Sequence, residues 1–264
     1  MYSRDNLVIL DADGTTIDAF TAIEHTFSHH RMDIGDLERF RKRRHLFKYL
    51  GGLKEFPGNI RQQLGKQKRS RLIETLTEIY REEATLYEHI APLIRSLIAQ
   101  EGLRVGLVTR NITHDPIETL TQLFERHGIP AAEFDFMIHL SLKQQKTAHF
   151  REIRNAFRIN PAKSHACGDE RQDFEAALGS GFHSFMVSYG FEDYERLTRK
   201  IGVPAELISQ SPAELSDRLS HTLNLDIGEQ AGYSAPEVTP DHAPMHGLNN
   251  RPVRRLEDSL RASP

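Results

Sequence analysis

Short runs of apolar residues, most of them followed by a polar cluster, recur along the chain and predict buried strands. Apolar runs of this length, bounded by turn residues, are typical of parallel sheets, whose strands are buried on both faces. Helical patterns separate the runs, and strands that alternate with helices favour a parallel sheet of βαβ units. The predicted strands are Leu7–Leu10, Arg104–Val108, Phe134–Ile138, Ser164–Cys167, Ser184–Val187 and a short sixth at Leu207-Ile208.

A long helical insertion is predicted between the first two strands, from residue 19 to about residue 100. Breaks at Gly51-Gly52 and Pro57-Gly58 divide it into several helices. Its apolar residues recur at helical spacing, for example at Leu72, Leu76, Ile79 and Tyr80. Further helices are predicted at about 115–127, 147–157 and 212–223, with another ending at 176–181.

The composition changes at about residue 227. From there to residue 264 the chain is rich in Gly, Pro and polar residues, and five of its 12 Pro residues lie after residue 235. A segment without apolar periodicity cannot bury enough surface to offset its ordering. We therefore expect residues 227–264 to be a largely disordered tail, with one or two helical turns at 253–260.

Charge and cysteine content narrow the class of protein. The net charge of −3 argues against a protein that coats nucleic acid, and the mean hydropathy of −0.51 favours a soluble one. No apolar run approaches the roughly 18–20 residues of a membrane span, and no signal-peptide pattern opens the chain. Cys167 is the only cysteine, which excludes an intramolecular disulfide and a thiolate zinc site. These features predict a cytoplasmic protein.

Two carboxylates stand close together after the first predicted strand, at Asp11 and Asp13. Carboxylates this close repel one another unless a positive charge lies beside them, and Mg²⁺ with its preference for oxygen ligands would supply it. One carboxylate could then attack phosphorus while the other handles a proton. An Asp-x-Asp pair alone is more often a solvated strand end, but Gly14-Thr15 and Asp18 behind it favour the functional interpretation.

The segment Asp11-Ala12-Asp13-Gly14-Thr15-Thr16-Ile17-Asp18 resembles the first motif of the haloacid dehalogenase (HAD) superfamily of phosphohydrolases. The resemblance covers about residues 5–225 and implies an α/β fold with a Rossmann-like, doubly wound parallel sheet. It makes Asp11 the nucleophile and a Mg²⁺ ligand, and Asp13 the general acid/base, with its backbone carbonyl also on the metal. The helical insertion then corresponds to a C1-type cap. We expect a core of residues 1–18 and 101–226, a cap of 19–100 and a tail of 227–264.

The other family motifs follow in order, each after a predicted strand. Thr109 stands in the place of the second motif, and with Arg110 it is expected to bind the phosphoryl group. The segment from Gly168 to Asp173 resembles the fourth motif, Gly-Asp-x-x-x-Asp. Asp169 is then a direct Mg²⁺ ligand, and Asp173, one helical turn later on the same face, binds directly or through a water. Glu170 is expected to be a solvated neighbour.

The resemblance also requires a lysine near a helix start, to neutralise the phosphoryl group and the attacking carboxylate. Lys143 and Lys146 both qualify, and neither is followed by the Pro that the family often has. The spacing in the sequence between Lys146 and Asp169 resembles that of the phosphoserine-phosphatase branch. The spacing between Lys143 and Asp169 resembles that of the phosphoglycolate-phosphatase-like members. We prefer Lys146, because Phe150 follows it at helical spacing, and keep Lys143 as second choice.

An Asp at position 13 favours phosphate esters over carbon–halogen or phosphonate substrates within the resemblance, because an alkoxide leaving group needs a proton. The expected activity is that of a magnesium-dependent phosphatase acting on a small anionic phosphate ester, phosphoglycolate-phosphatase-like. A sugar-phosphate mutase of the same family remains open, with His25 as a candidate gating base. A phospho-receiver module or a phosphate-binding protein without catalysis are alternatives of a different class.

A basic segment lies inside the predicted cap. Residues 36–71 contain 12 Lys or Arg and three acidic residues, which predicts either a solvated helix face or attraction of an anionic substrate. The Arg41–Arg44 run lacks interleaved aromatic residues, which argues against nucleic-acid binding. The Gly51-Gly52-Leu53-Lys54 segment is a candidate cap loop, with Lys54 able to contact a second anionic group of the substrate.

Overall fold

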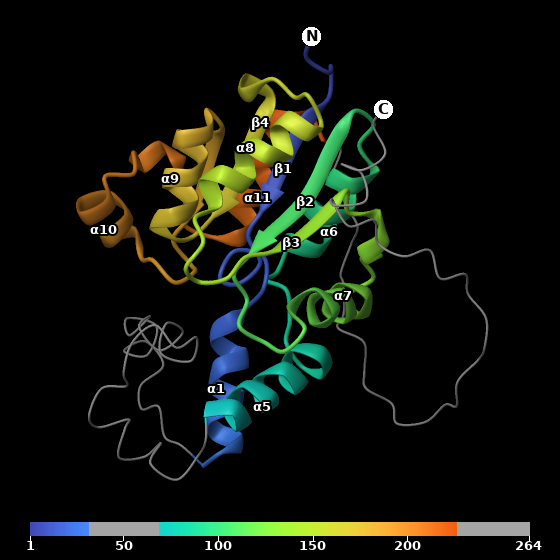
Figure 1. The fold of residues 1–264 in the computed structure, drawn as a ribbon. Helices are drawn as coiled ribbons and strands as arrows, with labels where there is room; N and C mark the ends of the chain where they lie inside the picture. The colour runs from blue at the N-terminus through green and yellow to red at the C-terminus, as the bar shows by residue number, and fades with distance from the viewer. Residues whose placement is uncertain (32–68, 226–264) are drawn as a thin grey trace, which may run out of the picture.

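The computed structural model describes residues 1–31 and 69–225, which form a six-stranded parallel sheet with helices on both faces (Figure 1). The strand order is β3-β2-β1-β4-β5-β6, and the predicted α/β doubly wound fold is confirmed. The order reverses between β1 and β4, and such a switch point is where open α/β sheets bind ligands. The strands are β1 (Asn6–Leu10), β2 (Leu103–Thr109), β3 (Phe136–His139), β4 (Ser164–Gly168), β5 (His183–Val187) and β6 (Ile208–Ser209).

Two helical layers bury the sheet. Alternate residues of β1 face opposite layers, Leu7 and Ile9 toward one and Val8 and Leu10 toward the other. The helices α8 (Lys146–Ala156) and α9 (Arg171–Ser180) cover the first face. The second face of the sheet is covered by α6 (Ile90–Ala99), α7 (Pro116–Arg126) and α11 (Pro212–Leu223). This two-sided burial explains why the strands read as continuous apolar runs. A short helix, α10 (Tyr194–Arg196), precedes β6.

The helices α1 (Ala19–His29) and α5 (Arg69–Glu82) pack on each other beside the carboxyl edge of the sheet (Figure 1). Two short linkers connect this pair to the core and hydrogen-bond to each other. The Asp18 amide donates to the Thr85 carbonyl at 2.9 Å, and the Tyr87 amide donates to the Thr16 carbonyl at 3.1 Å. Asp18 also caps α1, since its side chain accepts from the Thr21 amide at 3.2 Å.

The helix α6 lies inside the predicted cap range yet packs against β2 and α11. These contacts favour a boundary between cap and core earlier than residue 100, and the division of the chain into domains stays a prediction. The basic segment lies outside the described residues up to residue 68, as do the Gly51–Lys54 loop and the predicted tail of residues 227–264.

One predicted strand begins later than its apolar residues suggested. Phe134 was expected to open the third strand, but β3 begins at Phe136 after a 3-10 turn at Ala131–Glu133. The reason is the side chain of Asp135, which accepts a hydrogen bond from the Val105 amide at 2.8 Å. A carboxylate thus takes the place that a strand carbonyl would fill. Among the described helices, none is long and apolar enough to cross a membrane.

Candidate active site

The polar clusters predicted from the sequence meet at the carboxyl edge of the sheet. Asp11 follows β1, and its amide donates to the Cys167 carbonyl of the neighbouring strand β4 at 3.0 Å. Thr109 ends β2 and Asp169 follows β4, so that three adjacent strands contribute. All three side chains are at least nine-tenths buried. The parallel sheet therefore brings together residues that lie far apart in the sequence.

Asp11 lies against a buried lysine. The Lys146 ammonium group is 2.9 Å from Asp11 Oδ1 and 2.6 Å from Asp173 Oδ1, and Lys146 is only 1% exposed. Burial acts to lower the pKa of Lys146, but the charges of Asp11 and Asp173 outweigh it and raise the pKa above its usual value. Lys146 is therefore a fixed cation at the site. Lys143 is exposed on the loop before α8.

Asp13 has a different environment. The Tyr80 hydroxyl of α5 donates to Asp13 Oδ1 at 2.6 Å, and the Asn111 side-chain amide contacts both carboxylate oxygens, at 3.0 and 3.1 Å. Burial raises the pKa of Asp13 to about 6, while the hydrogen bonds from Tyr80 and Asn111 act to lower it. Both protonation states are therefore accessible near neutral pH.

Asp169 is fully buried behind the loop that follows β1. Its carboxylate accepts hydrogen bonds from the Phe191 amide and from the Thr15 hydroxyl, the latter at 3.3 Å. Gly190 closes the other side, where a Cβ atom would come within 2.4 Å of Asp169 Oδ2 and 2.3 Å of the Gly14 carbonyl. A larger residue at position 190 would displace the carboxylate, so the loop after β5 shapes this part of the site.

The carboxylates of Asp11, Asp169 and Asp173 can each place one oxygen within 4.8 Å of the others. Burial is the main reason that the pKa values of Asp11 and Asp169 are raised, and the charges of neighbouring carboxylates add to it, while Lys146 acts to lower the pKa of Asp11. Such a cluster of buried oxygen donors fits Mg²⁺, because a divalent cation would relieve the mutual repulsion. The Asp13 carboxylate is outside this group of three, and a metal contact through its backbone carbonyl stays a prediction.

The two predicted phosphate-binding residues differ in their surroundings. The Thr109 hydroxyl oxygen accepts from the Asn111 amide at 3.1 Å, which leaves the hydroxyl proton for another acceptor. The Arg110 guanidinium forms an ion pair with Glu170, whose side chain is 19% exposed. The expectation that Glu170 is a solvated neighbour is therefore wrong: the pair ties the loop after β2 to the start of α9.

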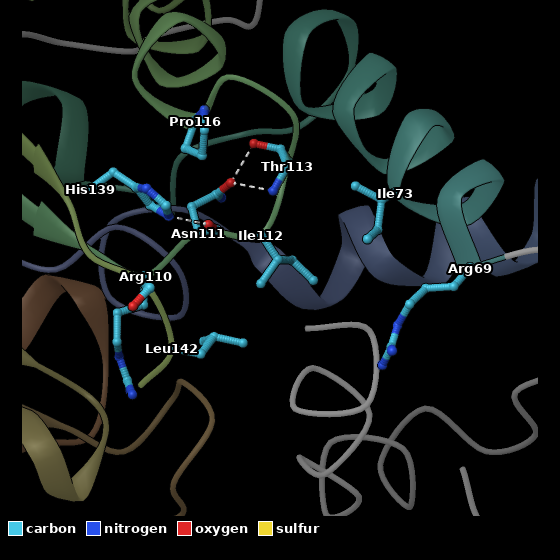
Figure 2. Close-up of a pocket in the computed structure, with 10 residues that line it drawn as sticks. Arg69, Ile73, Arg110, Asn111, Ile112, Thr113, Pro116, His139 and Leu142 are labelled. Atoms are coloured by element: carbon cyan, nitrogen blue, oxygen red, sulfur yellow. Dashed lines mark hydrogen bonds between the residues drawn. The ribbon is translucent and has the colours of Figure 1, made fainter. Parts of the chain in front are cut away.

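A hollow of about 340 Å³ opens next to these residues, between α5 and the loops that follow β2 and β3 (Figure 2). Asn111 joins the hollow to Asp13, because its side-chain oxygen is held by the Thr113 amide at 2.9 Å while its nitrogen reaches the carboxylate. The lining combines charged and apolar side chains, among them Arg69, Ile73, Arg110, Ile112, His139 and Leu142.

Sequence reasoning did not single out two residues that contact Asp13. Asn111 carried a signal, because it belongs to the polar cluster that follows β2. Tyr80 carried none, because it falls on the apolar stripe of α5, where an aromatic residue indicates packing. Only the three-dimensional arrangement shows that its hydroxyl reaches a carboxylate 67 positions away.

A doubly wound sheet with carboxylates and a buried lysine at its switch point defines an α/β protein of the Rossmann-like class with a ligand site at the carboxyl edge of its sheet. The chain belongs to the haloacid dehalogenase-like hydrolase family, whose sequence profile matches residues 8–187. The family membership predicted from the motifs is confirmed.

Curated relatives and solved structures agree with this assignment. The chain is 21% identical over 160 residues to a phosphoglycolate phosphatase from Vibrio vulnificus, covering 60% of this chain and 68% of the relative. Its fold is similar to CbbY from Rhodobacter sphaeroides in complex with xylulose-(1,5)bisphosphate, with 19% identity, a TM-score of 0.54 and coverage of 80% and 96%. A proposed beta-phosphoglucomutase from Thermotoga maritima has 18% identity, a TM-score of 0.54 and coverage of 82% and 99%.

Proposed function

We propose that this protein is a magnesium-dependent phosphatase that hydrolyses a small anionic phosphate monoester through an aspartyl-phosphate at Asp11. The observation that carries the proposal is the contrast between two neighbouring carboxylates. Asp11 lies beside the Lys146 cation and two further carboxylates, whereas the hydrogen bonds that Asp13 accepts come from neutral donors, Tyr80 and Asn111. Environments that differ this much suit different roles, nucleophile and acid/base.

In the first half-reaction an Asp11 oxygen attacks phosphorus and forms the acyl-phosphate bond. The bond from phosphorus to the ester oxygen breaks, and protonated Asp13 gives its proton to that oxygen. In the second half-reaction Asp13, now a carboxylate, takes a proton from the water that attacks phosphorus. The bond to Asp11 then breaks, inorganic phosphate leaves, and Asp13 is protonated again for the next turnover.

Three side chains would stabilise the transferred phosphoryl group. The Lys146 ammonium group lies where it would meet both Asp11 and a phosphoryl oxygen, and the Thr109 hydroxyl has a proton to donate. Arg110 would add a second cation, although Glu170 shares its charge. Because all these groups are buried or nearly so, their charges act in a low dielectric, where they are most effective.

Asp11, Asp169 and Asp173, with the backbone carbonyl of Asp13, would hold the Mg²⁺ ion. Bound there, Mg²⁺ would neutralise part of the phosphoryl charge and keep it in line with Asp11. Asp169 suits this role because the Phe191 amide and the Thr15 hydroxyl fix its orientation. Such support from neighbouring groups is typical of metal ligands.

The hollow beside Asn111 would take the organic part of the ester. Its apolar wall of Ile73, Ile112 and Leu142 suits a carbon skeleton, and Arg69 and Arg110 on the lining suit a negative charge. Phosphoglycolate is the first ester to test, because the relatives from Vibrio vulnificus are named for it. Sugar phosphates are the next, in view of the bisphosphate bound by CbbY.

A sugar-phosphate mutase is the alternative within the family. His25 was the candidate for its gating base, but His25 Nδ1 lies 3.0 Å from the Glu83 carboxylate, where both side chains are at least half exposed. That pairing favours a structural link between α1 and the end of α5. Isomerisation of a sugar phosphate without phosphate release would support the mutase.

The Asp11→Asn variant tests the proposal. We expect the wild-type protein with Mg²⁺ to release phosphate from at least one ester of a panel, and the variant to lose at least about 1,000-fold in kcat, since a nucleophile has no substitute. Mass spectrometry after rapid acid quenching detects the phosphoenzyme in the wild type only. Phosphate release by the variant at a rate near that of the wild type would contradict the mechanism. Failure of the wild type on every ester would favour a non-catalytic protein.

A further inference from the structure

The Tyr80 hydroxyl contacts Asp13, the proposed acid/base, but takes no part in the proposed proton transfers. Tyr80 lies on α5, outside the sheet, and is fully buried. A tyrosine hydroxyl that is buried needs a hydrogen-bond partner, and a core position without one would favour Phe. Here the partner is Asp13 Oδ1 at 2.6 Å, which is short for a hydrogen bond and typical of a charged acceptor.

The position of Tyr80 is fixed by contacts between α5 and α7. The Arg126 side chain of α7 donates to the Arg81 carbonyl at 3.1 Å and to the Ala84 carbonyl, and the Arg81 side chain donates to the Thr119 hydroxyl at 3.2 Å. These bonds hold the chain directly after Tyr80, at the end of α5, against α7. The hydroxyl therefore reaches Asp13 from a rigid support, as a positioning group requires.

The two oxygens of Asp13 are held unequally. Oδ1 accepts from both Tyr80 and Asn111, at 2.6 and 3.0 Å, while among residues 1–31 and 69–225 Oδ2 accepts only from Asn111, at 3.1 Å. An oxygen that already accepts two hydrogen bonds has little capacity left for a third. Oδ2 is therefore the oxygen that is available to exchange a proton with another molecule.

We propose that Tyr80 is a positioning residue, which holds Asp13 Oδ1 so that Oδ2 carries the proton to the ester oxygen and later takes one from water. This inference rests on the proposed phosphatase function and adds a residue from the helical insertion to it. In the first step the proton moves from Oδ2 to the leaving oxygen as the phosphorus–oxygen bond breaks. In the second it moves from the attacking water to Oδ2 as the bond to Asp11 breaks.

The Tyr80→Phe variant tests the inference through the leaving group of the ester. An alkyl phosphate needs the proton from Asp13, whereas p-nitrophenolate leaves without one. We expect kcat/KM, which reports the steps up to loss of the leaving group, to fall by about 10- to 100-fold for the best alkyl phosphate of the panel. For p-nitrophenyl phosphate we expect a fall of less than about threefold.

The comparison separates positioning from a packing role. The phenyl ring keeps the buried volume of Tyr80, and any loss of folded protein lowers the activity on both esters by the same factor. The control is Tyr189→Phe, which removes a hydroxyl that donates to the Thr15 carbonyl at 2.9 Å, and we expect it to leave the ratio of the two rates unchanged. Equal losses on both esters in Tyr80→Phe, or no loss, would overturn the inference. A wild-type protein that hydrolyses neither ester would instead overturn the proposed function.

Discussion

Lys146 is a buried cation between two buried carboxylates, Asp11 and Asp173, and the charge balance of the site depends on it. Moving a charge out of water costs several kcal/mol, so each member of such a group relies on the others. Its place at the first residue of α8 comes from a local pattern, because the apolar face of that helix, with Phe150 and Ile153, turns Lys146 inward. The same helix leaves Lys143 outside, three residues before its start.

The Lys146→Met variant removes the charge and keeps much of the shape of the side chain. We expect kcat to fall by at least about 100-fold, as for other groups that stabilise charge in a transition state. We expect the free energy of unfolding without Mg²⁺ to fall by about 3–5 kcal/mol, because the carboxylates lose their partner. Urea denaturation and a steady-state assay measure the two effects.

Lys143→Met is the matched control, since Lys143 is exposed and the substitution is the same. It should change the free energy of unfolding by no more than about 0.5 kcal/mol and leave kcat intact. A large loss of activity in the Lys143 variant, with an active Lys146 variant, would reverse the assignment of the phosphate-binding lysine.

At the scale of elements, the attachment of α5 to α7 determines where Tyr80 and the wall of the hollow lie. The last carbonyl groups of a helix lack partners within it, and an arginine can supply hydrogen bonds and a favourable charge there. Arg126 has this role for α5, with bonds to the carbonyls of Arg81 and Ala84. His127 supports it, since its Nε2 atom lies 3.2 Å from the Ala84 carbonyl.

The Arg126→Ala variant should weaken the attachment of the end of α5 to α7. We expect the free energy of unfolding to fall by about 1–3 kcal/mol, because the partly buried carbonyls of Arg81 and Ala84 lose a charged donor. Urea denaturation measures the change. The control is Arg199→Ala, which breaks an exposed pair with Glu195 and should cost no more than about 0.5 kcal/mol. Equal effects of the two substitutions would show that the α5 end does not depend on Arg126.

At the scale of the whole molecule, the chain alternates between strands and helices, and this pattern predicted a parallel sheet, which the family resemblance specified as doubly wound. The apolar runs are local signals, since strands buried on both faces have few polar positions. Family motifs located Asp11, Asp13, Thr109, Lys146, Asp169 and Asp173, and their convergence follows from the carboxyl edge of a parallel sheet.

Apolar patterns and family motifs could not predict which elements each helix face contacts. The stripe of α6 indicated that the helix is amphipathic, but not that it packs against β2 and α11. Tyr80 likewise fits the apolar stripe of α5, because its ring packs and only its hydroxyl is polar. Glu170 was misjudged because its partner, Arg110, is 60 positions away and on another strand end.

The binding of Mg²⁺ should depend on pH. Burial raises the pKa of Asp11 to about 7, so this ligand is partly protonated near neutral pH, and Mg²⁺ needs the carboxylate. Lowering the pH through about 7 therefore adds protons that compete with the metal and weakens its affinity. We expect the Mg²⁺ concentration that gives half the rise in Tm to be higher at pH 6 than at pH 8.

The Asp169→Asn variant is the control for that titration. It removes one of the three clustered carboxylates and should abolish the rise in Tm at both pH values. A rise in Tm that is independent of pH, or that persists in this variant, would contradict the assignment of these residues as ligands.

The central place of β1 has a consequence for synthesis of the chain. Leu10 pairs with Leu107 on one side and with Cys167 on the other, so β1 is synthesised before both of its neighbours and must wait for them. Parallel pairings over such distances close slowly, and an unpaired apolar strand is prone to aggregation in the meantime. Asp11, the proposed nucleophile, is thus synthesised well before Asp169, and the proposed catalytic site cannot form until β4 has emerged. Newly made chains of this protein should therefore depend on chaperones at an early stage, when the segment from Leu7 to Leu10 has no partner.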